Sequence, residues 1–254
     1  MGKIIAIVNQ KGGVGKTTTS VNLCSYLAEA KKRVLLVDLD PQANATSGLG
    51  IEHGKLEAGI YEALLGQKPL REVVVKTQEE YLWVAPATVA LAGAGIEMVS
   101  IENREFRLAL MLEEVRADYD YIIIDGPPSL GLLTVNSLVA ADSVLIPIQS
   151  EYYALEGLGQ LLETVGLVRD NLKPSLEIMG AVVTMFDRRN KLSGAVLDEL
   201  KKFFPGKVFD SLIPRSVKLA EAPSYGRSIL YYDPKSSGAK AYFALSQEVI
   251  SLEK

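Results

Sequence analysis

Residues suited to holding phosphate are concentrated near the N-terminus, directly after the apolar run 4–8. Glycines let consecutive backbone N–H groups turn inward around an anion where a helix begins. The Gly-Lys-Thr at 15–17 is typical of the end of a phosphate-binding loop, in which the lysine reaches the β and γ phosphates and the hydroxyl binds Mg²⁺. The predicted phosphate-binding residues are Lys11, Gly12, Gly13, Val14, Gly15, Lys16, Thr17 and Thr18.

Lys11 makes this loop unusual. The first glycine of the standard pattern would fall at Gln10, and Lys11 instead adds a second cation beside Gly12 and Gly13. A cation at the mouth of an already cationic loop is unfavourable unless additional negative charge faces it. A triphosphate supplies that charge, so we expect the ligand to be ATP together with Mg²⁺.

Three aspartates follow apolar runs that read as buried strands. Asp38 and Asp125 close the runs 34–37 and 121–124, and Asp40 begins a loop two residues after Asp38. We expect Asp125, with Thr17, to hold Mg²⁺ directly or through water, Asp38 to orient water ligands of the metal, and Asp40, in a mobile loop, to position the attacking water. Two structural alternatives stay open, a helix N-cap at Asp40 and a plain strand-end carboxylate at Asp38.

The elements that must position these residues follow from the hydrophobic pattern. Continuous apolar runs, which indicate strands buried on both faces, alternate with segments of helical periodicity. This order predicts an α/β fold, a doubly wound and mostly parallel sheet flanked by helices, in which ligands bind beyond the carboxyl ends of the strands. Long linkers are missing, so residues 1–254 are interpreted as one domain. The predicted strands are 4–8, 34–37, 82–84, 121–124, 144–148, 178–184 and 208–209.

The loop at 11–18 resembles the deviant Walker A loop of the ParA/MinD family of P-loop ATPases. Segments 37–42, 124–129 and 213–223 resemble the ParA (Soj) chromosome-partitioning branch of that family, and the similarity spans nearly the whole chain. The resemblance implies a slow Mg²⁺-dependent ATPase that forms an ATP-sandwich homodimer and is stimulated by a ParB-type partner protein. In such a dimer Lys11 would reach the γ-phosphate of the opposite subunit, and Lys11, Lys16 and Asp40 would be the catalytic residues.

The same resemblance places the adenine base near segments 184–187 and 214–216. Its expected contacts are Met185, Pro214 and Ser216, although the family more often has asparagine where this chain has Ser216. Segment 151–157 resembles a family segment that lies toward the dimer or partner surface.

The formal net charge of −4 conceals an uneven distribution, because residues 187–240 carry eleven Lys and Arg against six acids. Phosphate neutralisation needs only distributed cations, so this basic third indicates a surface for the DNA backbone, and a dimer would double it. The alternative is an ordinary solvated surface. The resemblance implies non-specific, ATP-dependent binding of double-stranded DNA, with the family's basic residue at Arg189. The expected DNA contacts are Arg189, Arg215, Lys218, Arg227 and Lys235.

The main alternative is a MinD-like, membrane-associated regulator of the cell-division site. That function requires a C-terminal amphipathic helix with a basic polar face. Here the apolar stripe Tyr242, Leu245, Val249 and Leu252 is accompanied by Ser, Gln and Glu, which predicts a helix docked on its own core and no membrane partner. A single cysteine, Cys24, fits a reducing compartment and argues against a cysteine-held metal cluster between subunits. We therefore expect a cytoplasmic, nucleoid-associated protein.

Overall fold

The computed structural model describes residues 1–151 and 154–252, with side chains omitted for 154–156. Its sheet has the strand order β3-β4-β2-β5-β1-β6-β7, and each pairing is parallel except that of β3 with β4. The α/β fold class predicted from the sequence is confirmed. The strands are β1 Lys3–Ile7, β2 Val34–Asp38, β3 Val75–Lys76, β4 Leu82–Ala85, β5 Tyr121–Asp125, β6 Ser143–Gln149 and β7 Glu177–Thr184.

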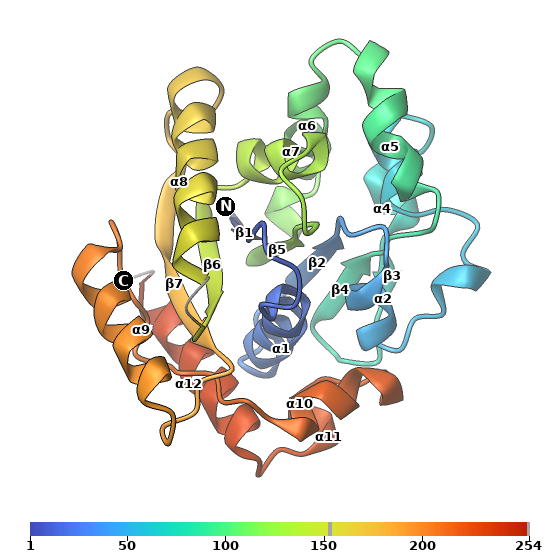
Figure 1. Ribbon diagram of the computed structural model, residues 1–254. Coiled ribbons are helices and arrows are strands. Elements are labelled where there is room, and N and C mark those ends of the chain that lie inside the picture. Colours follow the sequence, from blue (N-terminus) through green and yellow to red (C-terminus); the bar gives the residue numbers. More distant parts are fainter. Residues whose placement is uncertain (152–153, 253–254) are drawn as a thin grey trace.

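Helices cover both faces of this sheet, with α10 to α12 gathered on one side and α6 and α7 on the other (Figure 1). Side chains alternate along β1, so that Ile5 and Ile7 join the buried cluster formed with α1 and α12, whereas Ile4 and Ala6 join the cluster formed with α6, α7 and α8. The α-helices are α1 Lys16–Glu29, α2 Asn44–Gly48, α3 Ile60–Leu64, α4 Leu70–Val73, α5 Leu91–Glu97, α6 Arg107–Glu113, α7 Leu132–Ala140, α8 Ala154–Asn171, α9 Lys191–Phe203, α10 Val217–Glu221, α11 Ile229–Tyr232 and α12 Ser237–Ser251.

Two details of the predicted sheet are wrong. The strand expected at 208–209 is only an isolated bridge between Val208 and Ala181, and a second bridge joins Pro214 to Phe186. This segment runs along the outer edge of β7, where Pro214 has no N–H to continue a ladder. The short antiparallel strand β3 was not predicted, because two residues are too few to show the apolar run or alternation that indicates a strand.

The C-terminal helix α12 packs against α1, so the prediction that it docks on the core of its own chain is confirmed. Tyr242, Leu245 and Val249 are buried, and the Tyr242 hydroxyl lies 3.2 Å from Thr19 Oγ1 of α1. Leu252 departs from the prediction, because it is 41% exposed after the last turn. None of the helices in the part of the chain that the structure describes is both long and apolar enough to span a membrane.

Candidate nucleotide-binding site

The loop between β1 and α1 has the backbone of a phosphate cradle. Gly13 and Gly15 adopt φ values of 74° and 89°, a left-handed conformation that strongly favours glycine. The loop is held from outside, since the Thr184 hydroxyl donates to the Val14 carbonyl at 2.7 Å and Asn9 Oδ1 accepts from the Lys11 N–H at 3.0 Å. Residues at the ends of β1 and β7 therefore hold the backbone of the loop in place.

Lys16 is buried at the first turn of α1, and its ammonium donates back to the Lys11 carbonyl at 3.1 Å. Burial lowers the pKa of Lys16, and the carboxylates of Asp125 and Asp40 oppose that shift. A buried ammonium held by a single carbonyl of the loop retains hydrogen-bonding capacity for an anion.

Asp125 and Asp38 are register partners on β5 and β2, and both side chains are fully buried. Asp125 accepts hydrogen bonds from Thr17 Oγ1 at 2.8 Å and from Ser20 Oγ at 2.7 Å. Burial, and then the charge of Asp38, raise the pKa of Asp125. A hydroxyl and a carboxylate already in contact, beside a second carboxylate, form an oxygen donor set that fits Mg²⁺.

The carboxylate of Asp38 is occupied by backbone and side-chain donors of its own segment. Its Oδ2 accepts from the Thr46 N–H and hydroxyl at 2.8 and 2.7 Å, and its Oδ1 accepts from the Asp40 N–H at 3.1 Å. Burial raises the pKa of Asp38 against these hydrogen bonds. In this structure Asp38 anchors the segment that carries Asp40.

Asp40 is buried and accepts from the Gln42 N–H at 2.9 Å. It is not the N-cap of α2, because that helix begins at Asn44 and is preceded by Ala43 in a left-handed conformation. The expected helix-cap alternative is therefore wrong. The turn from Asp40 to Gln42, tied to Asp38, fixes the position of this carboxylate.

A cavity of about 610 Å³ lies between the phosphate loop and the segment that carries Asp40, and we call it the phosphate cavity. Glycines and threonines of the phosphate loop line one side of it, Asp40, Gln42 and Asn44 line another, and Pro128, Met185 and Arg227 complete the wall. This volume lies within the range of small-molecule pockets.

A smaller cavity of about 200 Å³ adjoins the loop at Gly15 and Thr18. It is lined by Met185, Pro214 and Ser216, the three residues predicted to contact the base. They meet because the chain after β7 lies beside segment 213–215, where the Phe186 N–H donates to the Ile213 carbonyl at 2.9 Å. The arrangement provides a phosphate cavity with a largely apolar recess beside it, as a nucleoside triphosphate requires.

The similarity of this chain to known proteins agrees with that geometry. Residues 2–178 match the protein family described as "AAA domain". The chain is 57% identical to the sporulation initiation inhibitor protein Soj of Bacillus subtilis, over 98% of both chains. It is 54% identical to the chromosome partitioning protein ParA of Myxococcus xanthus, over 98% of this chain and 88% of that protein. The chain belongs to the ParA/Soj family of ATPases.

A solved structure shows the same architecture. Cobyrinic acid a,c-diamide synthase from Mycobacterium smegmatis, determined with a bound ATP analogue and magnesium, superposes with a TM-score of 0.88 at 37% identity. The match covers 98% of this chain and 95% of that chain. The resemblance to ParA/MinD-type P-loop ATPases that the motifs indicated is confirmed.

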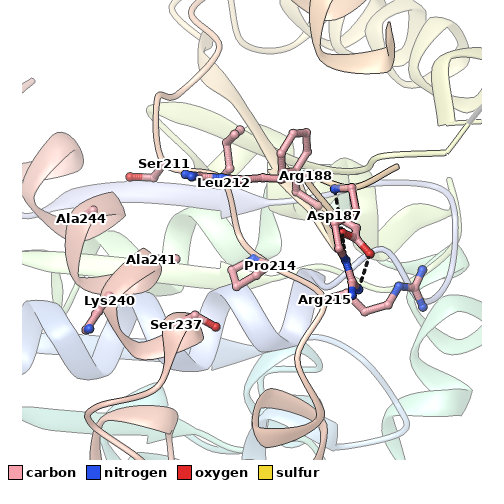
Figure 2. Close-up of a pocket in the computed structure, with 12 residues that line it drawn as sticks. Asp187, Arg188, Ser211, Leu212, Pro214, Arg215, Ser237, Lys240, Ala241 and Ala244 are labelled. Carbon is pink, nitrogen blue, oxygen red and sulfur yellow. Dashed lines mark hydrogen bonds and ion pairs between the residues drawn. The ribbon is translucent and has the colours of Figure 1, made fainter. Parts of the chain in front are cut away.

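The basic residues of this ParA/Soj chain fall in more than one place. A cavity of about 550 Å³ lies between the loop after β7, segment 211–215 and α12, and Figure 2 shows residues that line it. Four cationic residues line this cavity, and we call it the basic groove. They are Arg188, Arg189, Arg215 and Lys240.

Arg189 is held in this groove by Asp187, with which it forms hydrogen bonds at 2.9 and 3.0 Å. These hydrogen bonds lower the pKa of Asp187 to about 2. Sequence reasoning missed Arg188 and Lys240 as members of the groove, although both belong to the basic stretch 187–240.

The other predicted DNA contacts lie elsewhere. Lys218 is paired with Glu221 on α10 at 3.0 Å, and Lys235 is exposed just before α12. Arg227 lines the phosphate cavity instead of the basic groove. The structure therefore separates a set of residues that the sequence grouped by charge alone.

Lys11, the first lysine of the phosphate loop, pairs its ammonium with a carboxylate outside the loop. Its Nζ lies 3.8 Å from Oε2 of Glu151, which follows β6. Segment 151–157 was expected to face the dimer or partner surface. The side chains of residues 152–156 lie outside the part of the chain that the structure describes.

Proposed function

We propose that this chain is a Mg²⁺-dependent ATPase that separates replicated chromosomes or plasmids. In the proposed cycle ATP is sandwiched between two subunits, the resulting dimer binds double-stranded DNA without sequence preference, and a ParB-type partner stimulates hydrolysis. The observation that carries the proposal is the gathering of Lys16, Thr17 and Asp40 around one cavity next to a base-sized recess, with the buried Asp125 hydrogen-bonded to Thr17. Its site of action would be the nucleoid in the cytoplasm.

Each residue has a separate task in this proposal. Lys16 would bind the β and γ phosphates, and Thr17 and Asp125 would hold Mg²⁺, which neutralises phosphate charge when bound. Asp40 would orient the attacking water, because its carboxylate accepts from the Gln42 N–H and its backbone N–H donates to Asp38. Lys11 would complete the charge stabilisation from the opposite subunit.

The basic groove supports DNA as the ligand that the nucleotide state controls. A duplex presents regularly spaced phosphates, and one groove with four cations would bind it weakly and with strong salt dependence. A dimer presents two grooves, so the second binds at a high effective concentration. The MinD-like alternative is disfavoured because the apolar stripe of α12 is largely buried on α1.

The proposal is tested by DNA binding as a function of salt with ATP, with ADP and without nucleotide. We expect ATP-dependent binding whose affinity falls steeply with salt, by a slope of about −0.9 for each phosphate contact. Lys16→Ala is expected to abolish ATP binding and, with it, the ATP-dependent increase. The proposal fails if the ATP-bound protein ignores DNA at low salt but floats with anionic vesicles.

A further inference from the structure

The end of β6 lies between two groups of functional residues. β6 is flanked in the sheet by β1, which leads into the phosphate loop, and by β7, which leads into the basic groove. Parallel strands end at the same edge of the sheet, so the residues after β6 lie between the two. Glu151 is the second residue after the last residue of β6.

Glu151 contacts a cation on each side. Its Oε2 lies 3.8 Å from Lys11 Nζ, and its Oε1 lies 3.3 Å from a guanidinium nitrogen of Arg215. One carboxylate thus bridges the family's distinguishing lysine and a cation of the basic groove.

Neighbouring residues fix the position of this carboxylate. The Gln149 side-chain amide donates to Glu151 Oε1 at 2.6 Å. The Ser150 N–H donates to the Thr184 carbonyl at 3.1 Å, and the Ser150 hydroxyl donates to the Met185 carbonyl at 3.1 Å. The backbone before Glu151 is therefore tied to β7, and its carboxylate is aimed by a side chain of β6.

Both ion pairs are open to exchange. The side chains of Lys11, Glu151 and Arg215 are 37%, 45% and 63% exposed. Pairs of this kind contribute little to stability and are readily displaced by a competing anion. A phosphate that approaches either cation is such a competitor.

We propose that Glu151 is a positioning residue that restrains both cations in the nucleotide-free chain. The carboxylate must release Lys11 before that lysine can meet a phosphate, and it must release Arg215 before that arginine can meet DNA. The inference rests on the proposed function for the roles of these two cations. Glu151 would thus lower DNA binding by the protein without ATP.

The first test is DNA binding by nucleotide-free Glu151→Gln, which keeps the shape of the side chain and removes its charge. We expect affinity for duplex DNA at low salt to rise roughly two- to fivefold, the scale of a lost exposed ion pair. The salt slope is expected to steepen by about 0.9, because Arg215 gains a phosphate. In an Arg215→Gln background the substitution at Glu151 is expected to have no such effect.

Glu199→Gln is the matched control, because it changes the net charge equally and Glu199 forms no ion pair among the described residues. An equal gain in affinity by both variants would reduce the effect to overall charge and overturn the inference. Unchanged binding by Glu151→Gln would also overturn it. If the wild-type protein itself shows no ATP-dependent DNA binding, the proposed function fails. The inference about Glu151 fails when wild-type binding depends on ATP but Glu151→Gln binds no better than Glu199→Gln without nucleotide.

The Lys11 contact is tested without DNA by measuring how fast an N-hydroxysuccinimide ester acetylates Lys11, read by peptide mass spectrometry. Removing a paired carboxylate frees the amine, so Glu151→Gln is expected to raise the rate at Lys11 roughly two- to threefold. Lys235, exposed and without an ion pair among the described residues, serves as the internal reference in the same digest. A ratio of the Lys11 rate to the Lys235 rate that equals the wild-type ratio refutes the restraint on Lys11.

Discussion

Glu79 offers the sharpest test of the electrostatics behind the site. Its carboxyl is buried, and Oε1 accepts hydrogen bonds from Ser25 of α1 at 2.9 Å and from Ser228, just before α11, at 3.2 Å. Oε2 has no hydrogen-bond partner among the described residues. Glu79 therefore links the helix that follows the phosphate loop to Ser228 through one of its two carboxylate oxygens.

Burial raises the pKa of Glu79 from 4.5 to about 7. A carboxyl whose pKa is higher in the folded state binds more protons there than in the unfolded chain between about pH 4.5 and 7. The free energy of unfolding therefore falls as pH rises through that window. At 1.36 kcal/mol for each pKa unit, the ionised carboxylate costs at most about 3.4 kcal/mol above pH 8.

Glu79→Gln removes the charge and keeps the size. We expect it to raise the free energy of unfolding by about 1–3 kcal/mol more at pH 8 than at pH 5, because the amide cannot ionise. The gain stays below the maximum cost of about 3.4 kcal/mol, because the substitution does not recover all of it. The measurement is urea unfolding at both pH values, followed by circular dichroism. Glu80→Gln is the control, because Glu80 is the next residue in the chain and its side chain is exposed. A Glu79→Gln variant whose effect is the same at both pH values would refute the reasoning.

Four further variants separate the roles assigned above. Asp40→Ala is expected to retain ATP binding and lose about 100-fold or more in turnover, so that an ATP-bound complex persists on DNA; rapid hydrolysis would contradict the role of Asp40. Asp125→Asn should weaken nucleotide affinity about tenfold or more in calorimetric titrations with Mg²⁺. The loss of nucleotide affinity should be smaller when EDTA removes the metal. Arg227→Gln should lower nucleotide affinity about three- to tenfold, because Arg227 lines the phosphate cavity, while DNA affinity at saturating ATP changes less. A larger loss of DNA affinity than of nucleotide affinity would show that Arg227 belongs to the DNA-binding surface. Arg189→Glu should reduce DNA affinity about tenfold and make the salt slope shallower by about 1, and a matching loss of nucleotide affinity would show that it acts elsewhere.

Much of the site is encoded locally and was predicted for that reason. Gly13 and Gly15 specify the left-handed turns of the loop. Asp38 and Asp125 end continuous apolar strands, and the parallel sheet brings strand ends to one edge. The glycine turns and the acid at the end of each apolar strand depend on neighbours within a few residues, and the sequence displays them directly.

Other contacts depend on strand order and helix packing, which no local pattern records. Ser20 meets Asp125 because α1 crosses the end of β5, and Thr46 meets Asp38 because α2 folds back over β2. Charge counting grouped Arg227 with Arg189, although the path of the chain after α10 places Arg227 at the phosphate cavity. Lys240 reaches the basic groove only through the docking of α12.

The sequence by itself determined that this chain has a two-lysine phosphate loop on a parallel α/β sheet, because glycine conformation and apolar strands are short-range properties. The tertiary structure alone decided which side chain faces Lys11. Residues 11, 151 and 215 are far apart in the chain, and they meet because β6 lies between β1 and β7, so one carboxylate faces a cation from each side.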